Sequence, residues 1–413
     1  MVDHIRIKIV YAITTIIVIY FLLIGYFKLK YPFWSRQPVF HFYNLLYWAK
    51  PPGIINEQLP EKTKLYDEGI DFFNTNAMTT EKKELLCSFI KKCFAKNYSA
   101  NTKQILDNFD MHNDKSFISI KQYNYEILSC VTTRPLECHL DGNKMIVNYY
   151  DYLCVHDKHK NKHYSAKQIY THNLHLRNKC NNIVSFFKLE NETNMVVPLT
   201  RYTNYVFKID NWKMCYNFDQ PNINIVFINK SNMNKFYQIF SKAKEKFNCF
   251  ITYNLGHIFH LIEKEHLKVT VLMINSKIKA FFIFKNTYHE HINERENEHK
   301  NEHKNEHKNE HKNEHKNEQQ GKDLGKHKIE CCSSYKHEDV NNELFTLGFM
   351  ISLSLISKDL SSKILSINNI SNNNIILKLL LERYKYIDTS TISLYFYNFA
   401  YYPKESKDIF CII

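Results

Sequence analysis

The sequence predicts a mixed α/β (α+β) fold that follows one N-terminal transmembrane helix. The chain has 413 residues, which is enough to bury a large core and long for one compact domain, so two domains or one double-sized fold are expected. Runs of β-branched and aromatic residues alternate along it with segments of helical periodicity. Near the start lies an uncharged apolar run that is long enough to cross a membrane.

The transmembrane helix is predicted at Ile9–Phe27. This run would span roughly 28 Å as a helix that rises about 1.5 Å per residue, which matches the thickness of a hydrocarbon core. A cleaved signal peptide is the alternative, but the following GYFKLK offers no small-residue cleavage site, so a retained anchor is favoured. Lysine and arginine flank both ends, so the charge rule gives only weak evidence for orientation.

The composition argues against nucleic-acid binding and against a metal site. The formal net charge is +13, but abundant Asn, Lys and Ile indicate AT-rich coding that raises the lysine content, and no basic patch interleaved with aromatics is found. The 11 cysteines include no C-x-x-C pair and no zinc spacing, and Cys331 and Cys332 are adjacent. A reducing, cytosol-facing compartment is therefore expected.

The first part of the chain is predicted to form a loop, a helix and three strands. Pro51–Pro60 is a loop, and Thr80–Lys96 is an amphipathic helix that Thr79 or Thr80 would cap. The strands are predicted at Ser116–Gln122, Ile127–Thr133 and Arg134–Asp141, with Asp141-Gly142 as a hairpin turn.

The segment Met145–Arg177 carries the clearest chemical signal. It begins as a strand, becomes a basic loop at Asp157–His163, and continues as a helix at Ser165–Arg177. A strand, loop and helix in this order offer backbone N–H groups and a positive helix end to a phosphate, so a diphosphate or CoA site is one interpretation. The loop would add the charges of Lys158, Lys160, Lys162 and His163. A solvated turn is the alternative, and without glycine the loop is neither a P-loop nor a dinucleotide fingerprint.

The rest of the chain continues the alternation of strands and helices. Strands are predicted at Ile183–Leu189, Met195–Leu199 and Ile223–Asn229, a helix at Ser241–Phe250, and a hairpin at Val269–Ile274 and Lys277–Phe284. Five NEHK copies at Asn297–Lys316 place like charges at i,i+4, so residues 289–340 are predicted to be a disordered insertion. Its regular histidines could bind a metal, but repeat slippage explains them, and no metal is predicted. Leu344–Leu355 is too short to span a membrane, so it is predicted to be a buried helix.

Three segments resemble the N-myristoyltransferase family. Tyr31–Val39, YPFWSRQPV, is similar to the family's Y-x-F-W-x-x-Q-P-V element. Asp151–Ser165, DYLCVHDKHKNKHYS, resembles its NFLCVHKKLRSKRVA segment, and Ile392–Ile413 resembles its C-terminal strand and short apolar end. The resemblance implies two GNAT-like halves fused about a pseudo-twofold. Residues 1–28 would be the anchor, residues 29–212 the acyl-CoA half, and residues 213–413 the peptide half.

The resemblance also implies roles for individual residues. The backbone N–H groups of Tyr152 and Leu153 would hold the oxyanion, and the α-carboxylate of Ile413 would be the base. Cys154 is interpreted as a buried structural thiol rather than a nucleophile. The implied acyl-CoA contacts are Tyr31, Pro32, Phe33, Trp34, Leu153, Cys154, Val155, Lys160, Asn161, Lys162, His163, Tyr164 and Ser165. The implied peptide contacts are Asp151, Tyr395, Tyr397 and Asn398, and Asp151 replaces the family's Asn.

The function implied is transfer of myristoyl from myristoyl-CoA to the N-terminal glycine of peptides or nascent proteins. A monomer is expected, anchored in a membrane with its body in the cytosol, without a metal and without nucleic acid. Two alternatives stay open: a GNAT-type N-acetyltransferase that uses a short acyl-CoA, and a degenerate acyl-CoA-binding or scaffolding membrane protein. Where the family carries a Gly-Asp-Gly turn, this chain has Tyr386-Ile-Asp-Thr-Ser, which puts the peptide preference in question.

Overall fold

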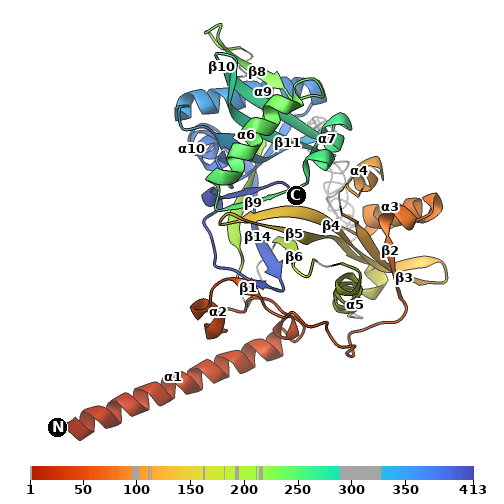
Figure 1. Ribbon diagram of the computed structural model, residues 1–413, viewed down its shortest axis with the longest axis vertical. Helices are drawn as coiled ribbons and strands as arrows, with labels where there is room; N and C mark the ends of the chain where they lie inside the picture. The colour runs from red at the N-terminus through yellow and green to blue at the C-terminus, as the bar shows by residue number, and fades with distance from the viewer. Residues whose placement is uncertain are drawn as a thin grey trace, which may run out of the picture.

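The protein is built on one twisted sheet of 14 strands with helices packed against it (Figure 1). The computed structural model describes residues 2–94, 102–109, 112, 114–160, 163–180, 182–190, 195–210, 212–213, 217–288 and 327–413. The sheet order is β16-β9-β4-β5-β6-β14-β7-β13-β12-β11-β10-β8, and β2 and β3 extend it beside β4. The predicted mixed α/β class is confirmed.

The first half of the sheet follows the chain order strand, helices, three strands, helix, strand. Its elements are β2 (Ile70–Asn74), α3 (Thr80–Cys93), α4 (Thr102–Asp107), β3 (Phe117–Tyr123), β4 (Glu126–Leu140), β5 (Asn143–Val155), α5 (Tyr164–Lys179) and β6 (Ser185–Glu190). Asp141 and Gly142 both have positive φ, as the predicted hairpin turn between β4 and β5 requires.

The second half repeats this order with one additional strand, β9, between its first two helices. Its elements are β8 (Ile223–Phe227), α6 (Met233–Lys246), β9 (Cys249–Thr252), α7 (Leu255–Glu263), β10 (Leu267–Ile274), β11 (Lys277–Tyr288), β12 (His327–Lys336), α9 (Asn342–Leu360) and β13 (Ile364–Asn368). In each half a helix joins two parallel strands: α5 joins β5 to β6, and α9 joins β12 to β13.

The two halves exchange one strand each, which fuses them into one sheet. After the first half, β7 (Thr200–Lys208) pairs with β13 of the second half. After the second half and α10 (Asn373–Arg383), β14 (Tyr386–Tyr397) returns to pair with β6 of the first half. This reciprocal exchange is the pseudo-twofold arrangement that was predicted.

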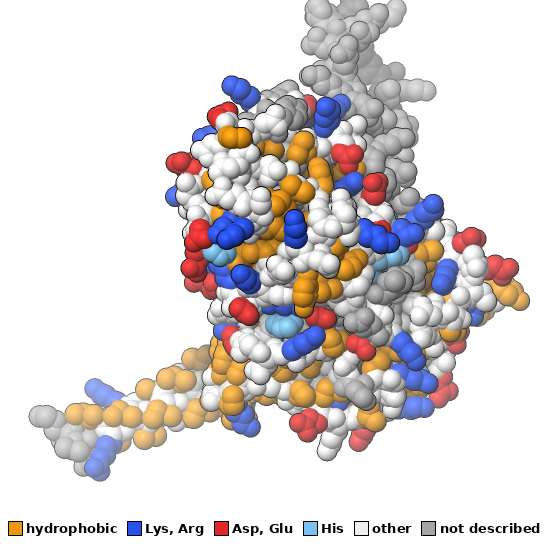
Figure 2. All heavy atoms as spheres, turned by 45° about the horizontal axis from the view of Figure 1, so that its top comes forward, with side chains coloured by type: hydrophobic (Ala, Val, Ile, Leu, Met, Phe, Trp, Pro, Cys, Tyr) orange, Lys and Arg blue, Asp and Glu red, His pale blue; other side chains and the backbone are white. Residues whose placement is uncertain are grey.

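The N-terminal helix α1 (Val2–Lys30) projects from the body as a separate rod (Figure 1). Its side chains are mostly hydrophobic along its length, with lysine and arginine toward its ends (Figure 2). Among the described residues, His4–Lys30 is the one helix that is long and apolar enough to cross a membrane. It meets the body at its C-terminal end, where Tyr20 Oη donates to the carbonyl of Tyr43 at 2.6 Å.

The segment after α1 crosses back to the C-terminal part of the chain. Its short elements are α2 (Leu45–Ala49) and β1 (Gly53–Ile54), and β1 pairs with β15 (Phe399–Ala400). The last strand, β16 (Ile409–Cys411), lies parallel to β9 and ends between the two halves (Figure 1).

Several predicted elements differ from the structure. β4 is one continuous strand through Pro135, because Arg134 and Leu136 both keep cross-strand partners on β5. Met195–Leu199 forms only an isolated bridge, through Val196. The helix predicted at Ser241–Phe250 is the end of α6 followed by β9, in which Cys249 and Phe250 pair with β16. The predicted end of the disordered insertion, residue 340, is wrong, because strand β12 begins at His327. The NEHK repeat itself lies outside the described residues. The buried helix predicted at Leu344–Leu355 is confirmed within α9.

The helix α5 is joined to the sheet by a buried histidine whose titration should govern acid stability. His172 Nδ1 lies 2.7 Å from Ser119 Oγ and its Nε2 lies 2.9 Å from Thr133 Oγ1. Burial lowers the pKa of His172 to about 3. Because the unfolded chain binds this proton below about pH 6.5 and the folded chain does not, stability should fall as the pH drops from about 6.5 to about 3.

We expect His172→Gln to remove part of this acid destabilisation. Measuring the free energy of unfolding from pH 7 to pH 4 should give a shallower pH slope for His172→Gln than for the native chain. The matched control is His163→Gln, at an exposed position before α5. An unchanged slope in His172→Gln would assign the acid sensitivity to other groups.

Candidate active site

A cavity opens where β5 and β6 separate. The two strands pair only at Asn148–Ser185 and Tyr149–Phe186, and beyond this point they diverge. The cavity between them has a volume of about 280 Å³ and is mainly apolar. It is lined by Trp34, Phe94, Tyr149, Tyr150, Asp151, Tyr152, Leu153, Ile169, Phe187, Lys188, Leu189 and Tyr397. Five site residues that were predicted from the sequence line this cavity: Trp34, Asp151, Tyr152, Leu153 and Tyr397. A sixth, Tyr395, stacks on Phe187 of the cavity wall.

A bulge in β5 forms one wall of this cavity. The pairing of β5 with β4 shifts so that Tyr152 and Leu153 together face Val131. Tyr152 has φ of +47°, the left-handed region, which non-glycine residues seldom adopt. A bulge of this kind interrupts the ladder and redirects backbone groups, which is how a strand can aim N–H donors at a ligand. Leu153 is 38% exposed, the one exposed side chain at the bulge.

The Asp151 carboxylate binds the bulge and a buried arginine at the same time. Its Oδ1 accepts a hydrogen bond from the Tyr152 N–H at 2.9 Å, and its Oδ2 lies 3.1 Å from Arg134 Nη2. Arg134 is only 2% exposed, between the rings of Tyr149 and Tyr253 at 5.2 Å each. Burial opposes the charge on Arg134, but Tyr253 and Asp151 outweigh burial and raise its pKa. One of the two predicted oxyanion donors thus has an anionic partner in this structure.

Sequence reasoning missed Arg134. A charged residue in the middle of a strand that is mostly buried is a signal for a buried ion pair, because an isolated buried charge is very costly. The Nε and Nη1 atoms of Arg134 have no hydrogen-bond partner within the described part of the chain. The guanidinium therefore depends on Asp151 and on the two aromatic rings.

Removing Arg134 should be more damaging than removing the whole pair. We expect Arg134→Met to lower the free energy of unfolding by about 3–5 kcal/mol, because it leaves the Asp151 carboxylate without its cation. Adding Asp151→Asn should recover most of this loss, since it removes the uncompensated charge. Denaturant unfolding of the single and double variants tests this coupling, with the exposed Arg201→Met as the control. Additive losses in the double variant would contradict it.

Cys154 belongs to the core rather than to the cavity. It is 1% exposed and packs with residues of α3 and α4 beside Cys130. A hydrogen bond with the Cys130 thiol and burial both raise the pKa of Cys154. Because the thiolate is the nucleophilic form, this position favours the predicted structural thiol over covalent catalysis.

The basic loop lies at the start of α5. Asp157–His159 forms a short 3₁₀ turn, and Lys160 Nζ pairs with Asp157 Oδ1 at 2.6 Å on the surface. His163 precedes the helix with φ of +56°, and the helix begins at Tyr164 with Ser165 in its first turn. Val155 ends β5 just before the loop, whereas the predicted contacts Asn161 and Lys162 lie outside the described residues. Asp157 reduces the positive charge that the sequence alone suggested for this loop.

The N-terminal element that follows α1 contributes Trp34 to the wall of the cavity. Trp34 stacks on Phe187 at 5.5 Å, and its carbonyl oxygen lies 2.9 Å from His41 Nε2. Tyr31 continues from α1 through a hydrogen bond to Phe27, and Pro32 and Phe33 lead into the 3₁₀ turn at Trp34–Arg36. Of the four predicted contacts in this element, the structure brings Trp34 into the cavity wall.

The C-terminal strand β14 supports the same wall from behind. Tyr395 is fully buried and stacks on Phe187, and Tyr397 Oη donates to Gln37 Oε1 at 2.7 Å. Asn398 is also fully buried, and its side chain bonds the backbone of Asn56 in both directions. Tyr395 and Asn398 therefore pack behind the cavity wall, whereas Tyr397 lines the cavity itself.

A group of charges connects the cavity to Ile413. Lys285 Nζ lies 3.3 Å from the carbonyl oxygen of Ile413. Burial opposes ionisation of Glu330 on the next strand, but Lys188, which lines the cavity, and Lys285 outweigh it and lower the pKa of Glu330. Neither lysine was singled out from the sequence, because their proximity depends on strand exchange between the halves.

Comparison with solved structures identifies the fold. A crystal structure of Saccharomyces cerevisiae N-myristoyltransferase with bound myristoyl-CoA superposes with a TM-score of 0.68 at 11% identity, over 91% of this chain and 94% of that chain. A second such structure gives a TM-score of 0.69 at 10% identity, over 94% and 95% of the two chains. No family model and no curated protein sequence matches the chain. The fold of this chain is therefore that of N-myristoyltransferase, as the three motifs indicated.

Proposed function

We propose that this protein transfers a myristoyl group from myristoyl-CoA to the N-terminal glycine amine of a peptide or nascent protein. The observation that carries the proposal is the cavity at the β5 bulge, within a fold that matches a myristoyl-CoA-bound acyltransferase over nearly the whole chain. The apolar and aromatic lining suits an alkyl thioester, and the basic loop at the start of α5 suits the CoA phosphates.

The chemistry is direct attack. The glycine amine attacks the thioester carbon, the C–S bond breaks after a tetrahedral oxyanion forms, and CoA leaves as its thiolate. The α-carboxylate of Ile413 accepts a proton from the amine, and this proton then neutralises the departing sulfur. The N–H groups of Tyr152 and Leu153 stabilise the oxyanion. Before the Tyr152 N–H can act, it must exchange its Asp151 partner for the substrate oxygen.

The same contact favours a second candidate function, acyl-CoA binding without transfer. A carboxylate that holds one oxyanion donor also places negative charge where more negative charge must develop. Arg134 offsets this charge, since it pairs with the other carboxylate oxygen. The two candidates differ in turnover and not in acyl-CoA affinity.

We also propose a membrane anchor, which the length and apolar composition of α1 support. We place α1 across a membrane and the sheet on its cytosolic side, where the abundant unpaired cysteines and acyl-CoA belong. We also propose that the protein acts as a monomer. An enzyme tethered in this way would release its lipidated products beside the membrane that they join.

The test is acylation by the full-length chain in detergent micelles. We expect glycine-starting peptides to be acylated with myristoyl-CoA far faster than with acetyl-CoA, and alanine-starting peptides to be poor acceptors. Product mass identifies the acyl group on each peptide. Acetyl transfer alone would replace the proposal by the N-acetyltransferase alternative. Tight acyl-CoA binding without any transfer would establish the binding function instead.

A further inference from the structure

A second, larger cavity lies between α5 and the segment that follows α1. Its volume is about 550 Å³, and its walls come from the segment after α1, the loop before β2, and the C-terminal half of α5. Every charged residue in the lining is a cation: Arg36, Lys64 and Arg177. A cavity with cations and without a lining carboxylate attracts anions.

Two unsatisfied polar groups lie at the floor of this cavity. Arg177 is 6% exposed, and its Nη2 donates to the carbonyl of Asn56 at 2.9 Å, while its Nε has no partner in the part of the chain that is described. One turn earlier, Asn173 is 2% exposed, and its Oδ1 also lacks a described partner. A buried donor and a buried acceptor without partners are costly, and a bound ligand would satisfy both. Burial lowers the pKa of Arg177, and an anion would oppose this shift.

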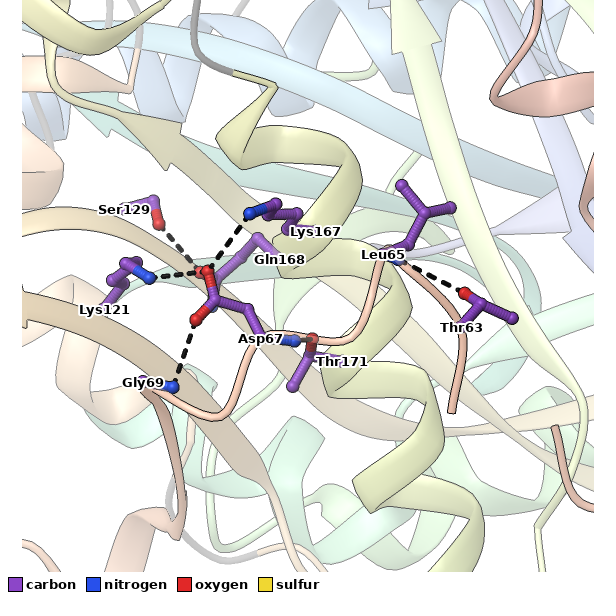
Figure 3. Close-up of polar contacts among 9 residues, drawn as sticks. All are labelled: Thr63, Leu65, Asp67, Gly69, Lys121, Ser129, Lys167, Gln168 and Thr171. Atoms are coloured by element: carbon purple, nitrogen blue, oxygen red, sulfur yellow. Dashed lines mark hydrogen bonds and ion pairs between the residues drawn. The ribbon is translucent and has the colours of Figure 1, made fainter. Parts of the chain in front are cut away.

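The wall that carries Lys64 is fixed in place (Figure 3). Asp67 N–H donates to Thr171 Oγ1 at 3.0 Å, which attaches the loop to α5, and the Asp67 carboxylate pairs with Lys121 at 2.5 Å. Thr63 Oγ1 accepts from the Leu65 N–H at 3.3 Å, which shapes the turn around Lys64. The Asp67 carboxylate faces Lys121 and Lys167 (Figure 3), and Lys64, which lines the cavity, forms no ion pair within the described part of the chain.

We propose that this cavity is a second ligand site, which binds a phosphate-bearing molecule with its phosphate between Arg177 and Lys64. Asn173 Oδ1 would accept a hydrogen bond from a hydroxyl or amine beside that phosphate. Tyr397 lines both this cavity and the one proposed for acyl-CoA, but the two phosphate positions differ, because Arg177 lies about 20 Å along α5 from the basic loop at its start. Residues 35–39, His41 and Asn44 line the cavity a few residues after α1 ends, so a lipid headgroup and a soluble phosphate ester are both candidate ligands.

Calorimetric titration of the full-length chain in nonionic detergent tests this site. The probes are inorganic phosphate and dihexanoyl phosphatidic acid, with dihexanoyl phosphatidylcholine as the lipid control. We expect one phosphate per chain, and binding weakened about tenfold or more in Arg177→Gln, because a charge-assisted hydrogen bond to the buried guanidinium is lost. Lys64→Gln should weaken binding several-fold. The control Lys179→Gln removes an exposed charge from the same helix outside the cavity, and should bind like the native chain.

The outcomes separate the sources of phosphate. Phosphatidic acid that binds far more tightly than inorganic phosphate supports a lipid headgroup, whereas equal affinities support a soluble phosphate. No binding, or equal binding by the native chain, Arg177→Gln and Lys64→Gln, would overturn the site. Loss of phosphate binding in the presence of saturating CoA would also overturn it, because the anion would then belong to the acyl-CoA site. If Arg177→Gln does not fold, the exposed pair Arg36→Gln and Lys64→Gln carries the same test.

Discussion

Adding two glycine residues after Ile413 is expected to lower acyl transfer by about 10²–10⁴-fold, the usual contribution of a positioned general base. The extension moves the α-carboxylate away from Lys285, which lies 3.3 Å from the Ile413 carbonyl oxygen. Acyl-CoA binding should stay unchanged, because the cavity lining does not include Ile413. Steady-state kinetics with a glycine peptide and acyl-CoA titration measure the two effects separately.

The matched control for the extension is Ile413→Leu, which keeps the carboxylate in place and changes only the apolar side chain. It should retain transfer within a few-fold of the native rate. Ile412 is fully buried and its N–H donates to the Ile251 carbonyl at 3.0 Å, so the end of the chain is fixed up to the last residue. Equal rates for the extended and native chains would exclude the Ile413 carboxylate as the base.

Leu153→Pro is expected to lower kcat by about 10²–10³-fold, the cost of one oxyanion donor. Proline removes the N–H of residue 153 and is tolerated at bulges more readily than inside a regular ladder. Leu153→Ala is the control, because it shortens the exposed side chain but keeps the N–H. Circular dichroism and acyl-CoA titration would show that both variants keep the fold. Equal kcat values for the two variants would remove Leu153 from the oxyanion site.

Asp151 determines how these predictions combine. Its carboxylate accepts a hydrogen bond from the Tyr152 N–H, so this N–H must leave Asp151 before it can stabilise the oxyanion. If the Tyr152 N–H leaves Asp151 during the reaction, Asp151→Asn alone should raise the rate of acyl transfer above that of the native chain. The fold by which Leu153→Pro lowers kcat should then be the same with and without Asp151→Asn. The charge of Arg134 would then lack its partner, which is why the stability of this variant has to be measured beside its rate.

The sequence predicted the site through local motifs and the fold through their family resemblance. The strand, loop and helix around Asp151–Ser165 were placed within a few residues, because apolar periodicity and a basic break mark them clearly. The strand exchange between β7 and β14 was not visible in any periodicity, since it depends on pairing between residues far apart in the chain.

The residues that the sequence did not indicate were missed for the same reason, since their contacts depend on the pairing of strands. Arg134 meets Asp151 across a hairpin with a bulge, and a one-residue change of register would place the two on opposite faces. Lys188 and Lys285 come together with Glu330 only after the two halves have joined. Tyr152 was predicted as a donor, but its hydrogen bond to the preceding side chain depends on the positive φ that the bulge imposes.

The most direct test of direct acyl transfer is intact-mass spectrometry of one reaction mixture that contains the full-length chain, myristoyl-CoA and a glycine-starting peptide. We expect the peptide to gain one myristoyl group at its N-terminal amine and the protein to gain none, because the Cys154 thiol is buried with a raised pKa. A myristoylated protein that transfers its acyl group onward to the peptide would contradict direct attack. An unmodified peptide beside bound myristoyl-CoA would contradict the acyltransferase assignment itself.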